Sequence, residues 1–358
     1  MIAFNQHDTD KAKLLIDAAR RVVILTHMSP DGDAMGSSLA MRIYLENKGK
    51  EVNVIIPNAY PSFLAWMPGA DKDIVYDRQP QEADRLIEEA ELIVCTDFNV
   101  PKRIGTAGEK MLASTCPKIL IDHHLFPDEF ADVTFSFPES PSASEIVYRL
   151  LMAMNDNHME ILTTDLATCL YTGMMTDTGN FSFNSNHPEM YEAVAQLVRL
   201  GVDKDAVYNQ VFNAYTADRM RLMGYCLYSK MQIFPEHHAA FVSLSRKDLY
   251  RFNFQPGDAG GLVNLPLQIS DVYYSCFMRE DKVYPAEMNI AGGSRRKIKI
   301  SMRSQGDRPV NTFCHDIFGG GGHKNAAGGE YYGPLQEAVD LFLNNYKSYF
   351  LSASTNFG

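Results

Sequence analysis

Histidines and acidic residues recur directly after apolar segments in the first half of the chain. These apolar segments are short, and each has the length of a buried strand. The residues concerned are His27, Asp31 and Asp33 after the run 22–26, Asp97 after the run 92–96, Asp122, His123 and His124 after the run 118–121, and Asp177 after the helical pattern 166–175. Imidazole and carboxylate ligands without thiolates suit manganese, with magnesium or cobalt as alternatives.

Two histidines and four aspartates can hold two divalent ions when one carboxylate bridges them. A metal pair about 3.5–4 Å apart is the usual apparatus for in-line attack on phosphorus. Asp97 is the central candidate for the bridging carboxylate. The spacing therefore predicts a dinuclear site for hydrolysis of phosphate esters.

Each segment taken alone has a simpler interpretation. The sequence Asp31-Gly32-Asp33 is typical of a turn in which Asp33 caps the following helix. A single aspartate such as Asp97 after a strand often has the same role. Residues 176–179 fit the end of a helix terminated by glycine. The metal hypothesis rests on the convergence of these segments at one place.

The elements around these residues predict that convergence. Strand-like runs at 22–26, 52–57, 92–96 and 118–121 alternate with helical patterns, which predicts an α/β domain with a mostly parallel sheet and helices on both faces. Ligands of such sheets bind beyond the carboxyl ends of the strands. We therefore expect the acidic residues and histidines to meet at one edge of the sheet.

The second half of the chain predicts a smaller α/β domain. The pattern from 144 to about 230 is largely helical. Strand-like runs follow at 239–244, 271–278 and 297–302, then a glycine cluster at 319–322 and an amphipathic helix at 335–346. We expect a catalytic domain at 1–212, a helical linker at 213–229 and a substrate-binding domain at 230–350.

The composition of the chain limits which kinds of molecule and which cellular compartment we expect for it. The net charge of −11 argues against a protein that coats long nucleic acids, because the phosphate backbone would be repelled. No apolar run reaches the length of a membrane span, and the first residues lack the apolar core of a signal peptide. The six scattered cysteines favour reduced core residues. We expect a cytoplasmic protein without membrane association.

The quoted residues, in this order, resemble the DHH phosphoesterase family, which is named for the element seen here as Asp122-His123-His124. The match also includes His27-x-x-Pro30-Asp31-x-Asp33, the segment 176–181, and the run 318–329, which resembles the DHH-associated C-terminal domain. Within this family, the chain most resembles the branch of oligoribonucleases and phosphatases of adenosine 3′,5′-bisphosphate.

The resemblance implies a role for each residue of the centre. One metal ion would take His27, Asp31 and Asp97. The other would take Asp97 together with Asp33, His123 and Asp177. His124 would face the scissile phosphate, and it forms the expected catalytic set with Asp122 and Asp97.

Residues of the second domain are expected to hold the substrate. The glycines at 320, 321 and 322, followed by His323, can present backbone N–H groups to a phosphate, although a plain turn is the alternative interpretation. Arg303 and Arg279 are expected to grip a terminal phosphate or a base. The expected substrate-binding residues are Gly320, Gly321, Gly322, His323, Arg303 and Arg279.

The expected activity is hydrolysis of short oligonucleotides, linear dinucleotides or adenosine 3′,5′-bisphosphate. Substrates gripped between two domains would be short, so long RNA is not expected to be a partner. The alternatives are an inorganic pyrophosphatase or exopolyphosphatase of the same superfamily, and a nucleotide-binding module without catalysis. A homodimer through the helical middle is compatible with the sequence, but no residue pattern requires it.

Overall fold

The computed structural model describes residues 4–154, 162–255, 257–283 and 296–354. The chain divides into two compact units, Met1–Ala214 and Tyr215–Gly358. The segment 213–229, which we expect to be a linker, begins at this division, and its helix α10 (Ala217–Tyr225) belongs to the second unit. Among the described residues, no helix combines the length and the apolar character that crossing a bilayer requires.

The first unit alternates strands and helices in the order predicted from the sequence. Its elements are α1 (Gln6–Ala18), β1 (Arg21–Leu25), α2 (Gly32–Asn47), β2 (Glu51–Ile56), η1 (Ser62–Leu64), η2 (Ala70–Lys72), β3 (Ile74–Val75), α3 (Pro80–Glu89), β4 (Leu92–Thr96), η3 (Pro101–Ile104), α4 (Thr106–Ala113), β5 (Lys118–Asp122), β6 (Val133–Ser136), α5 (Ala143–Met154), α7 (Thr164–Asp177), α8 (Pro188–Arg199) and α9 (Lys204–Phe212).

The strands of the first unit form one parallel sheet in the order β3-β2-β1-β4-β5-β6. The chain runs outward from β1 to β3 on one side, and then returns to β4 on the other side of β1. The order therefore reverses between β1 and β4. In open sheets of this kind, the crevice beyond the carboxyl ends of the strands at the reversal is the usual ligand site.

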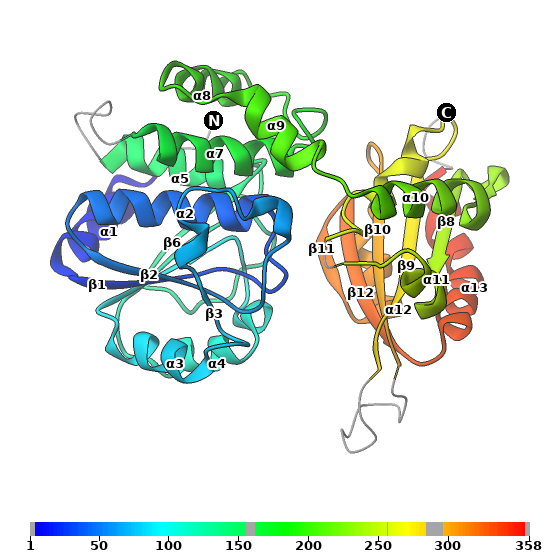
Figure 1. Ribbon diagram of the computed structural model, residues 1–358, viewed down its shortest axis with the longest axis horizontal. Helices are drawn as coiled ribbons and strands as arrows, with labels where there is room; N and C mark the ends of the chain where they lie inside the picture. The colour runs from blue at the N-terminus through cyan, green and yellow to red at the C-terminus, as the bar shows by residue number, and fades with distance from the viewer. Residues whose placement is uncertain (1–3, 155–161, 256, 284–295, 355–358) are drawn as a thin grey trace. The chain divides into compact units, whose positions relative to one another are not determined.

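Helices cover both faces of this sheet, as Figure 1 shows, with α2, α5 and α7 on one side and α3 and α4 on the other. Apolar side chains of α1, α2, α5 and α7 pack against Ile24, Val94 and Ile121. Side chains of α3 and α4 pack against Val23 and Leu120 on the opposite face. Successive strand residues point to opposite faces, so continuous apolar runs are what a sheet covered on both sides requires.

Helices α2 and α7 cross at very short range because glycines lie at the contact. A Cβ atom on Gly36 would lie 2.6 Å from the carbonyl oxygen of Cys169. A Cβ atom on Gly173 would lie 2.0 Å from Ser144 Oγ and 2.7 Å from Asp33 Oδ1. This close approach brings the beginning of α2 next to the end of α7, where Asp33 and Asp177 lie.

The second unit holds a mixed sheet. Its elements are α10 (Ala217–Tyr225), the π-helical turn η4 (Cys226–Lys230), β7 (Gln232–Phe234), η5 (Pro235–His237), β8 (Ala239–Leu244), α11 (Arg246–Arg251), η6 (Leu262–Gln268), β9 (Tyr274–Val283), β10 (Arg296–Ser304), α12 (Asn311–Phe318), β11 (Gly321–His323), β12 (Ala326–Tyr332) and α13 (Leu335–Ser354).

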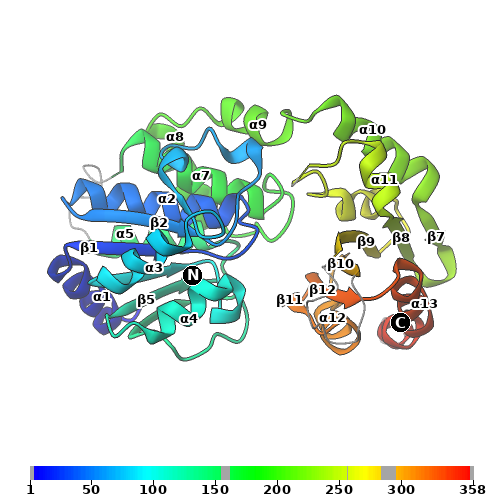
Figure 2. The same ribbon diagram turned by 60° about the horizontal axis from the view of Figure 1, so that its bottom comes forward.

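The sheet of the second unit has the order β11-β12-β10-β9-β8-β7. Strands β8 and β9 are parallel, and the other neighbours are antiparallel. Figure 2 shows α12 and α13 on one side of this sheet and α10 and α11 on the other. Alternate residues of β9 divide between the two cores: Cys276 and Met278 pack in the core that contains Phe313 and Phe342, and Phe277 packs in the other.

The predicted fold class is therefore confirmed: a parallel sheet flanked by helices in the first unit and a second unit with a mixed sheet. The six cysteines are unpaired, and all except Cys116 are buried, as predicted. The predicted glycine cluster proves to be partly a strand, because residues 321–323 form β11. The helical stretch predicted from 144 to 230 is broken into several helices, and its residues 155–161 lie outside the described part of the chain.

Candidate metal centre

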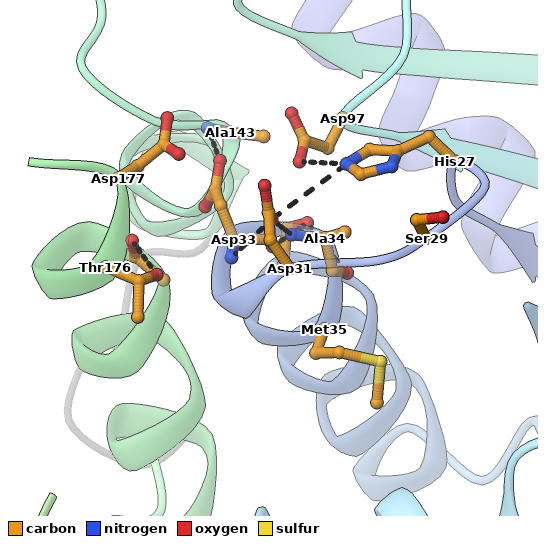
Figure 3. Close-up of polar contacts among 12 residues, drawn as sticks. His27, Ser29, Asp31, Asp33, Ala34, Met35, Asp97, Ala143, Thr176 and Asp177 are labelled. Atoms are coloured by element: carbon orange, nitrogen blue, oxygen red, sulfur yellow. Dashed lines mark hydrogen bonds and ion pairs between the residues drawn. The ribbon is translucent and has the colours of Figure 1, made fainter. Parts of the chain in front are cut away.

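The acidic residues and histidines of the first unit meet at the carboxyl edge of its sheet, where the strand order reverses. Figure 3 shows side chains from the loop after β1, the start of α2, the end of β4 and the end of α7 turned toward one common space. The residues that this edge brings together are His27, Asp31, Asp33, Asp97, Asp122, His123, His124 and Asp177.

Asp97 lies at the middle of this cluster, and its two carboxylate oxygens face different histidines. Its Oδ2 is 3.3 Å from His27 Nε2, and its Oδ1 is 3.3 Å from His123 Nε2. The side chain is buried, and its backbone has a φ of 62°, in the left-handed region that non-glycine residues rarely adopt. Backbone strain of this kind often accompanies functional sites.

Backbone carbonyls fix the orientation of both histidines. The Nδ1 of His27 lies 2.9 Å from the carbonyl oxygen of Met28, and the Nδ1 of His123 lies 3.2 Å from that of Ser140. A carbonyl only accepts hydrogen bonds, so each Nδ1 carries a proton and each Nε2 faces the carboxylates. Nε2 donates to them when the ring is protonated and can offer its lone pair to a cation when the ring is neutral. Histidines that bind metals are held in this way, with the non-ligating nitrogen bonded to a carbonyl or carboxylate.

Asp31 and Asp33 have different roles, and the helix-capping role that the local sequence pattern suggested for Asp33 belongs to Asp31. Asp31, and not Asp33, caps α2: its carboxylate accepts hydrogen bonds from the backbone N–H groups of Asp33 and Ala34, both at 3.1 Å. Asp33 is fully buried and accepts from the backbone N–H groups of Ala143 at 2.6 Å and Ser144 at 2.9 Å, at the start of α5.

Asp33 and Asp177 complete the side of the cluster around His123. The Nε2 of His123 lies 3.8 Å from Asp33 Oδ2 and 3.4 Å from Asp177 Oδ2. On the other side, His27 Nε2 lies 3.9 Å from Asp31 Oδ1. The side chain of Asp177 keeps 28% of its exposure and that of Asp31 keeps 57%, so both reach solvent from the edge of the cluster.

Crowding of these groups shifts their proton affinities in opposite directions. Burial raises the pKa of Asp33, and the nearby Asp97 carboxylate adds to this, so that the pKa reaches about 7. Burial and repulsion from other carboxylates also raise the pKa of Asp177 well above its usual range. Burial acts against charge on Asp97 as well, yet contacts with His123 and His27 hold its pKa well below the ordinary value.

The two histidines beside Asp97 respond to its charge. Burial lowers the pKa of His27 and of His123, but the surrounding carboxylates together outweigh burial and raise both pKa values, that of His123 well above its usual range. Asp97 acts on both histidines, with Asp31 adding to its effect on His27, and Asp177 and Asp33 adding to its effect on His123. Without a cation, this centre must bind protons to compensate its excess negative charge. Four carboxylates and two imidazole nitrogens directed at one space are the expected ligands of divalent ions.

His124 is oriented by Asp122, the last residue of β5. Asp122 is fully buried, and its two oxygens accept from His124, one from the backbone N–H at 3.0 Å and the other from Nδ1 at 2.7 Å. Burial lowers the pKa of His124, in contrast to the pKa of its neighbour His123. Asp122 therefore positions the imidazole, and contact with a substrate would be made through Nε2.

The donors fit a pair of metal ions. The set His27, Asp31 and Asp97 has ligand atoms within 4.8 Å of one another, and so does the set Asp33, Asp97 and His123. Both sets share Asp97, whose Oδ1 is buried without a hydrogen-bond partner of good geometry among the described residues. An unsatisfied buried carboxylate oxygen is costly, and a cation coordinated there would remove that cost.

Two predicted residues of the second unit lie on either side of the same residue of the sheet. His323 on β11 and Arg303 on β10 both pair directly with Ala326 of β12, so their side chains project from the same face of the sheet. Arg279 lies on the neighbouring strand β9, and its guanidinium pairs with Asp281 at 2.8 Å. The charge of Arg279 is thus already matched within the unit.

The glycine run of the second unit presents fewer backbone N–H groups than its sequence predicts. The Gly320 N–H donates to the carbonyl oxygen of Cys314 at 3.0 Å, so it is engaged within the unit. Gly321 and Gly322 belong to edge strand β11, which pairs with β12. A Cβ atom on Gly320 would lie 1.9 Å from the carbonyl oxygen of Gly328. This position therefore requires glycine because a side chain would not fit beside the neighbouring strand.

Sequence reasoning missed several groups that shape the centre. The backbone N–H groups of Ala143 and Ser144 and the carbonyl of Ser140 carry no side-chain signal, and they reach the centre only through tertiary structure. Arg103, on η3 after β4, is also part of the surroundings, because its charge acts on His27 and His124. Its position six residues after Asp97 is the one sequence signal that could have indicated it.

Comparison with known proteins agrees with this geometry. Residues 21–174 match the DHH family, N-terminal domain. The bifunctional oligoribonuclease and PAP phosphatase NrnA of Thermus thermophilus is 27% identical over 345 residues, which cover 93% of this chain and 93% of that protein.

Solved structures extend the similarity to the second unit. The crystal structure of an exopolyphosphatase-related protein from Bacteroides fragilis is 43% identical, covers 98% of both chains and has a TM-score of 0.89. RecJ of Thermus thermophilus, solved with Mn²⁺, shares the fold with a TM-score of 0.55 at 14% identity, where 98% of this chain covers 55% of RecJ. On the family match and the 43% identity over nearly the whole chain, this protein belongs to the DHH family.

Proposed function

We propose that this protein is a metal-dependent phosphoesterase that hydrolyses short oligonucleotides and adenosine 3′,5′-bisphosphate. The observation that carries the proposal is the position of Asp97, whose two oxygens face the Nε2 atoms of two differently placed histidines. A carboxylate in this position is suited to bridge two cations. The overlapping ligand sets around it support a dinuclear centre.

The residues divide between two ions in this proposal. His27, Asp31 and Asp97 would hold one ion, and Asp33, Asp97, His123 and Asp177 would hold the other. Manganese suits this mixture of imidazole and carboxylate, with magnesium or cobalt as alternatives. When bound, the pair supplies Lewis acidity and neutralises charge on the phosphoryl group during in-line attack.

The chain itself supplies orientation and a proton donor. Asp122 holds the imidazole of His124 by Nδ1, which directs the ring with respect to the centre. A bound phosphate favours the protonated imidazole because opposite charges attract. Nε2–H of that form can donate to a phosphoryl oxygen and stabilise the charge that develops on it.

Residues of the second unit are suited to bind one end of a nucleotide substrate. His323 and Arg303 project from one face of its sheet, and a guanidinium binds phosphate oxygens by two parallel hydrogen bonds. Relatives named oligoribonuclease and PAP phosphatase match nearly the whole chain, including this unit. The net charge of −11 favours short substrates over long RNA.

A second candidate is hydrolysis of inorganic polyphosphate or pyrophosphate. The observation in its favour is the 43% identity with a protein described as exopolyphosphatase-related. Both activities would use the same centre, so the second unit would decide between them. A nucleobase offers apolar surface and hydrogen-bonding edges that polyphosphate lacks.

One panel of substrates separates these candidates. Release of mononucleotide or phosphate would be measured with Mn²⁺ and after chelation, for 5′-phosphorylated diadenylate, a long RNA, adenosine 3′,5′-bisphosphate, pyrophosphate and polyphosphate. We expect turnover of the dinucleotide and the bisphosphate, lost on chelation and in Asp97→Asn, but kept in the exposed control Asp205→Asn. Turnover of pyrophosphate or polyphosphate alone would establish the second candidate, and hydrolysis of long RNA at an equal rate would refute size selection.

A further inference from the structure

Arg103 is held beside the metal centre by its backbone. It lies on η3 (Pro101–Ile104), a few residues after Asp97. The carbonyl oxygen of Arg103 accepts a hydrogen bond from the backbone N–H of Met28 at 2.8 Å, which fastens η3 to the loop that carries His27. The N–H of Arg103 donates to the carbonyl oxygen of Val100 at 3.0 Å. The residue therefore joins the two loops at the reversal of strand order between β1 and β4.

Among the described residues, the guanidinium of Arg103 has no hydrogen-bond or ion-pair partner. Its Nη1 is buried and has no hydrogen-bond acceptor among the described residues. No carboxylate in the described part of the chain forms an ion pair with it, although the centre nearby is rich in acids. Buried arginines normally satisfy their donors: Arg42 in the same unit donates to the carbonyl oxygen of Gly69 at 2.9 Å and to Asp73 at 3.1 Å.

A buried guanidinium nitrogen without an acceptor, such as Nη1 of the partly buried Arg103, is costly. A charged donor without an acceptor loses its hydration and gains nothing in return, which is why such groups are rare in folded proteins. An anion from outside the chain that accepts a hydrogen bond from this guanidinium would explain why the group lies at the edge of the metal centre. The electrostatics agree: besides burial, which is the largest effect, the charge of Arg103 lowers the pKa of His124, and it opposes the rise in the pKa of His27.

The acceptor that fits is a phosphoryl oxygen. Guanidinium groups pair with phosphate by charge-assisted hydrogen bonds, which are strongest where water is excluded. An anion between Arg103 and His124 would lie next to Asp97 at the centre. No carboxylate of the described residues pairs with Arg103, so its Nη1 remains available to a substrate anion.

We propose that Arg103 binds a phosphoryl oxygen of the substrate through Nη1, on the side of the centre that carries His27 and His124. This inference rests on the proposed function, since it assigns the phosphate of that reaction to a residue of the first unit. Arg103 is then a substrate-binding residue that acts before and during attack, separately from the ligands that hold the ions.

The test compares Arg103→Met with Lys102→Met, an exposed cation on the same turn. Both remove one positive charge and keep an unbranched side chain. With the Mn²⁺-loaded protein, inorganic phosphate would be titrated calorimetrically, and KM and kcat would be measured for adenosine 3′,5′-bisphosphate. We expect Arg103→Met to weaken phosphate binding and raise KM by about 10- to 100-fold, as loss of a charge-assisted hydrogen bond predicts. Lys102→Met should stay within about 3-fold of wild type.

Stability and metal affinity provide readouts independent of turnover. Arg103→Met should leave the thermal midpoint without phosphate unchanged or higher, because it removes a buried N–H donor that has no acceptor among the described residues. Phosphate should raise that midpoint less than it does in the wild type. Arg103→Lys keeps the charge without the planar fork and should bind phosphate with intermediate affinity. Mn²⁺ affinity should be unchanged in all three variants.

Several outcomes would overturn the inference. Equal phosphate affinity in Arg103→Met and Lys102→Met would do so, as would a wild-type protein that does not bind phosphate. Loss of Mn²⁺ binding in Arg103→Met would show that the residue acts on the metal ligands. Wild-type protein that binds phosphate through Arg103 but hydrolyses nothing in the substrate panel would refute the proposed function and leave the phosphate site standing.

Discussion

Replacement of Gly173 by alanine tests whether the contact between α2 and α7 positions the metal ligands. The new Cβ would lie 2.0 Å from Ser144 Oγ, and 2.7 Å from both Ser144 Cβ and Asp33 Oδ1. The hydroxyl can rotate away, but the other two atoms cannot, because Ser144 Cβ is fixed by the backbone and Asp33 Oδ1 accepts from Ser144 N–H. Ordinary contact begins at 3.4 Å, so these atoms must move by 3.4 − 2.7, about 0.7 Å.

The expected cost follows from that displacement. Inserting a methyl group into a tightly packed contact lowers the free energy of unfolding by about 1–3 kcal/mol. The higher helix propensity of alanine offsets about 1 kcal/mol of this loss. For a unit of this size, each kcal/mol corresponds to a fall in the thermal midpoint of about 2–4 °C. A movement of about 0.7 Å also exceeds the roughly 0.5 Å within which ligands must be held. Mn²⁺ affinity should therefore fall about 10-fold or more.

The matched control is Gly224→Ala, since a Cβ atom on this helical glycine of α10 would meet nothing within 4 Å. It should leave Mn²⁺ affinity unchanged and should keep or slightly raise stability. Calorimetric unfolding and Mn²⁺ titration of both variants provide the comparison. Wild-type stability together with wild-type Mn²⁺ affinity in Gly173→Ala would refute the reasoning, because it would show that Asp33 does not depend on this contact for its position.

Two further predictions follow from the contacts of single carboxylates. Asp122→Asn should lower kcat by about 10- to 100-fold with little change in Mn²⁺ affinity, because it disturbs only the orientation of His124; an equal loss of metal binding would contradict the separation of these roles. In the second unit, burial raises the pKa of Asp248, but hydrogen bonds from Ser245 and the ion pair with Lys230 lower it to about 2. A folded-state pKa below the ordinary 3.8 means that the stabilisation is present above about pH 4 and is lost as pH falls through about 2. Unfolding of the wild type followed against pH should show this loss, and Asp248→Asn should not; parallel curves would exclude the contribution.

Local patterns were sufficient to predict the framework of the first unit. Runs of apolar residues such as 92–96 became fully buried strands, because a sheet covered on both faces needs them. The strands β3 and β6 escaped prediction because they are short: β3 has two residues, and β6 alternates buried and partly exposed positions over four. Such segments become strands through pairing with a neighbour and not through their own composition.

The convergence of the acidic residues was predictable, but their individual contacts were not. The rule that carboxyl ends of parallel strands meet at one edge was enough to place His27, Asp97 and His123 together. The exchange of roles between Asp31 and Asp33 depends on the N–H groups of Ala143 and Ser144, which lie more than a hundred residues away in the chain. That Nη1 of Arg103 is buried without an acceptor among the described residues is likewise a property of the folded surroundings, which no spacing in the sequence expresses.

The number of Mn²⁺ ions bound at saturation, measured by equilibrium dialysis alongside hydrolysis of 5′-phosphorylated diadenylate, tests the central claim most directly. With Asp97 between two ligand sets, the account predicts two ions per chain, turnover that requires both, and loss of turnover on chelation. Full hydrolysis with one ion or none bound, or unchanged binding of two ions by Asp97→Asn, would contradict it.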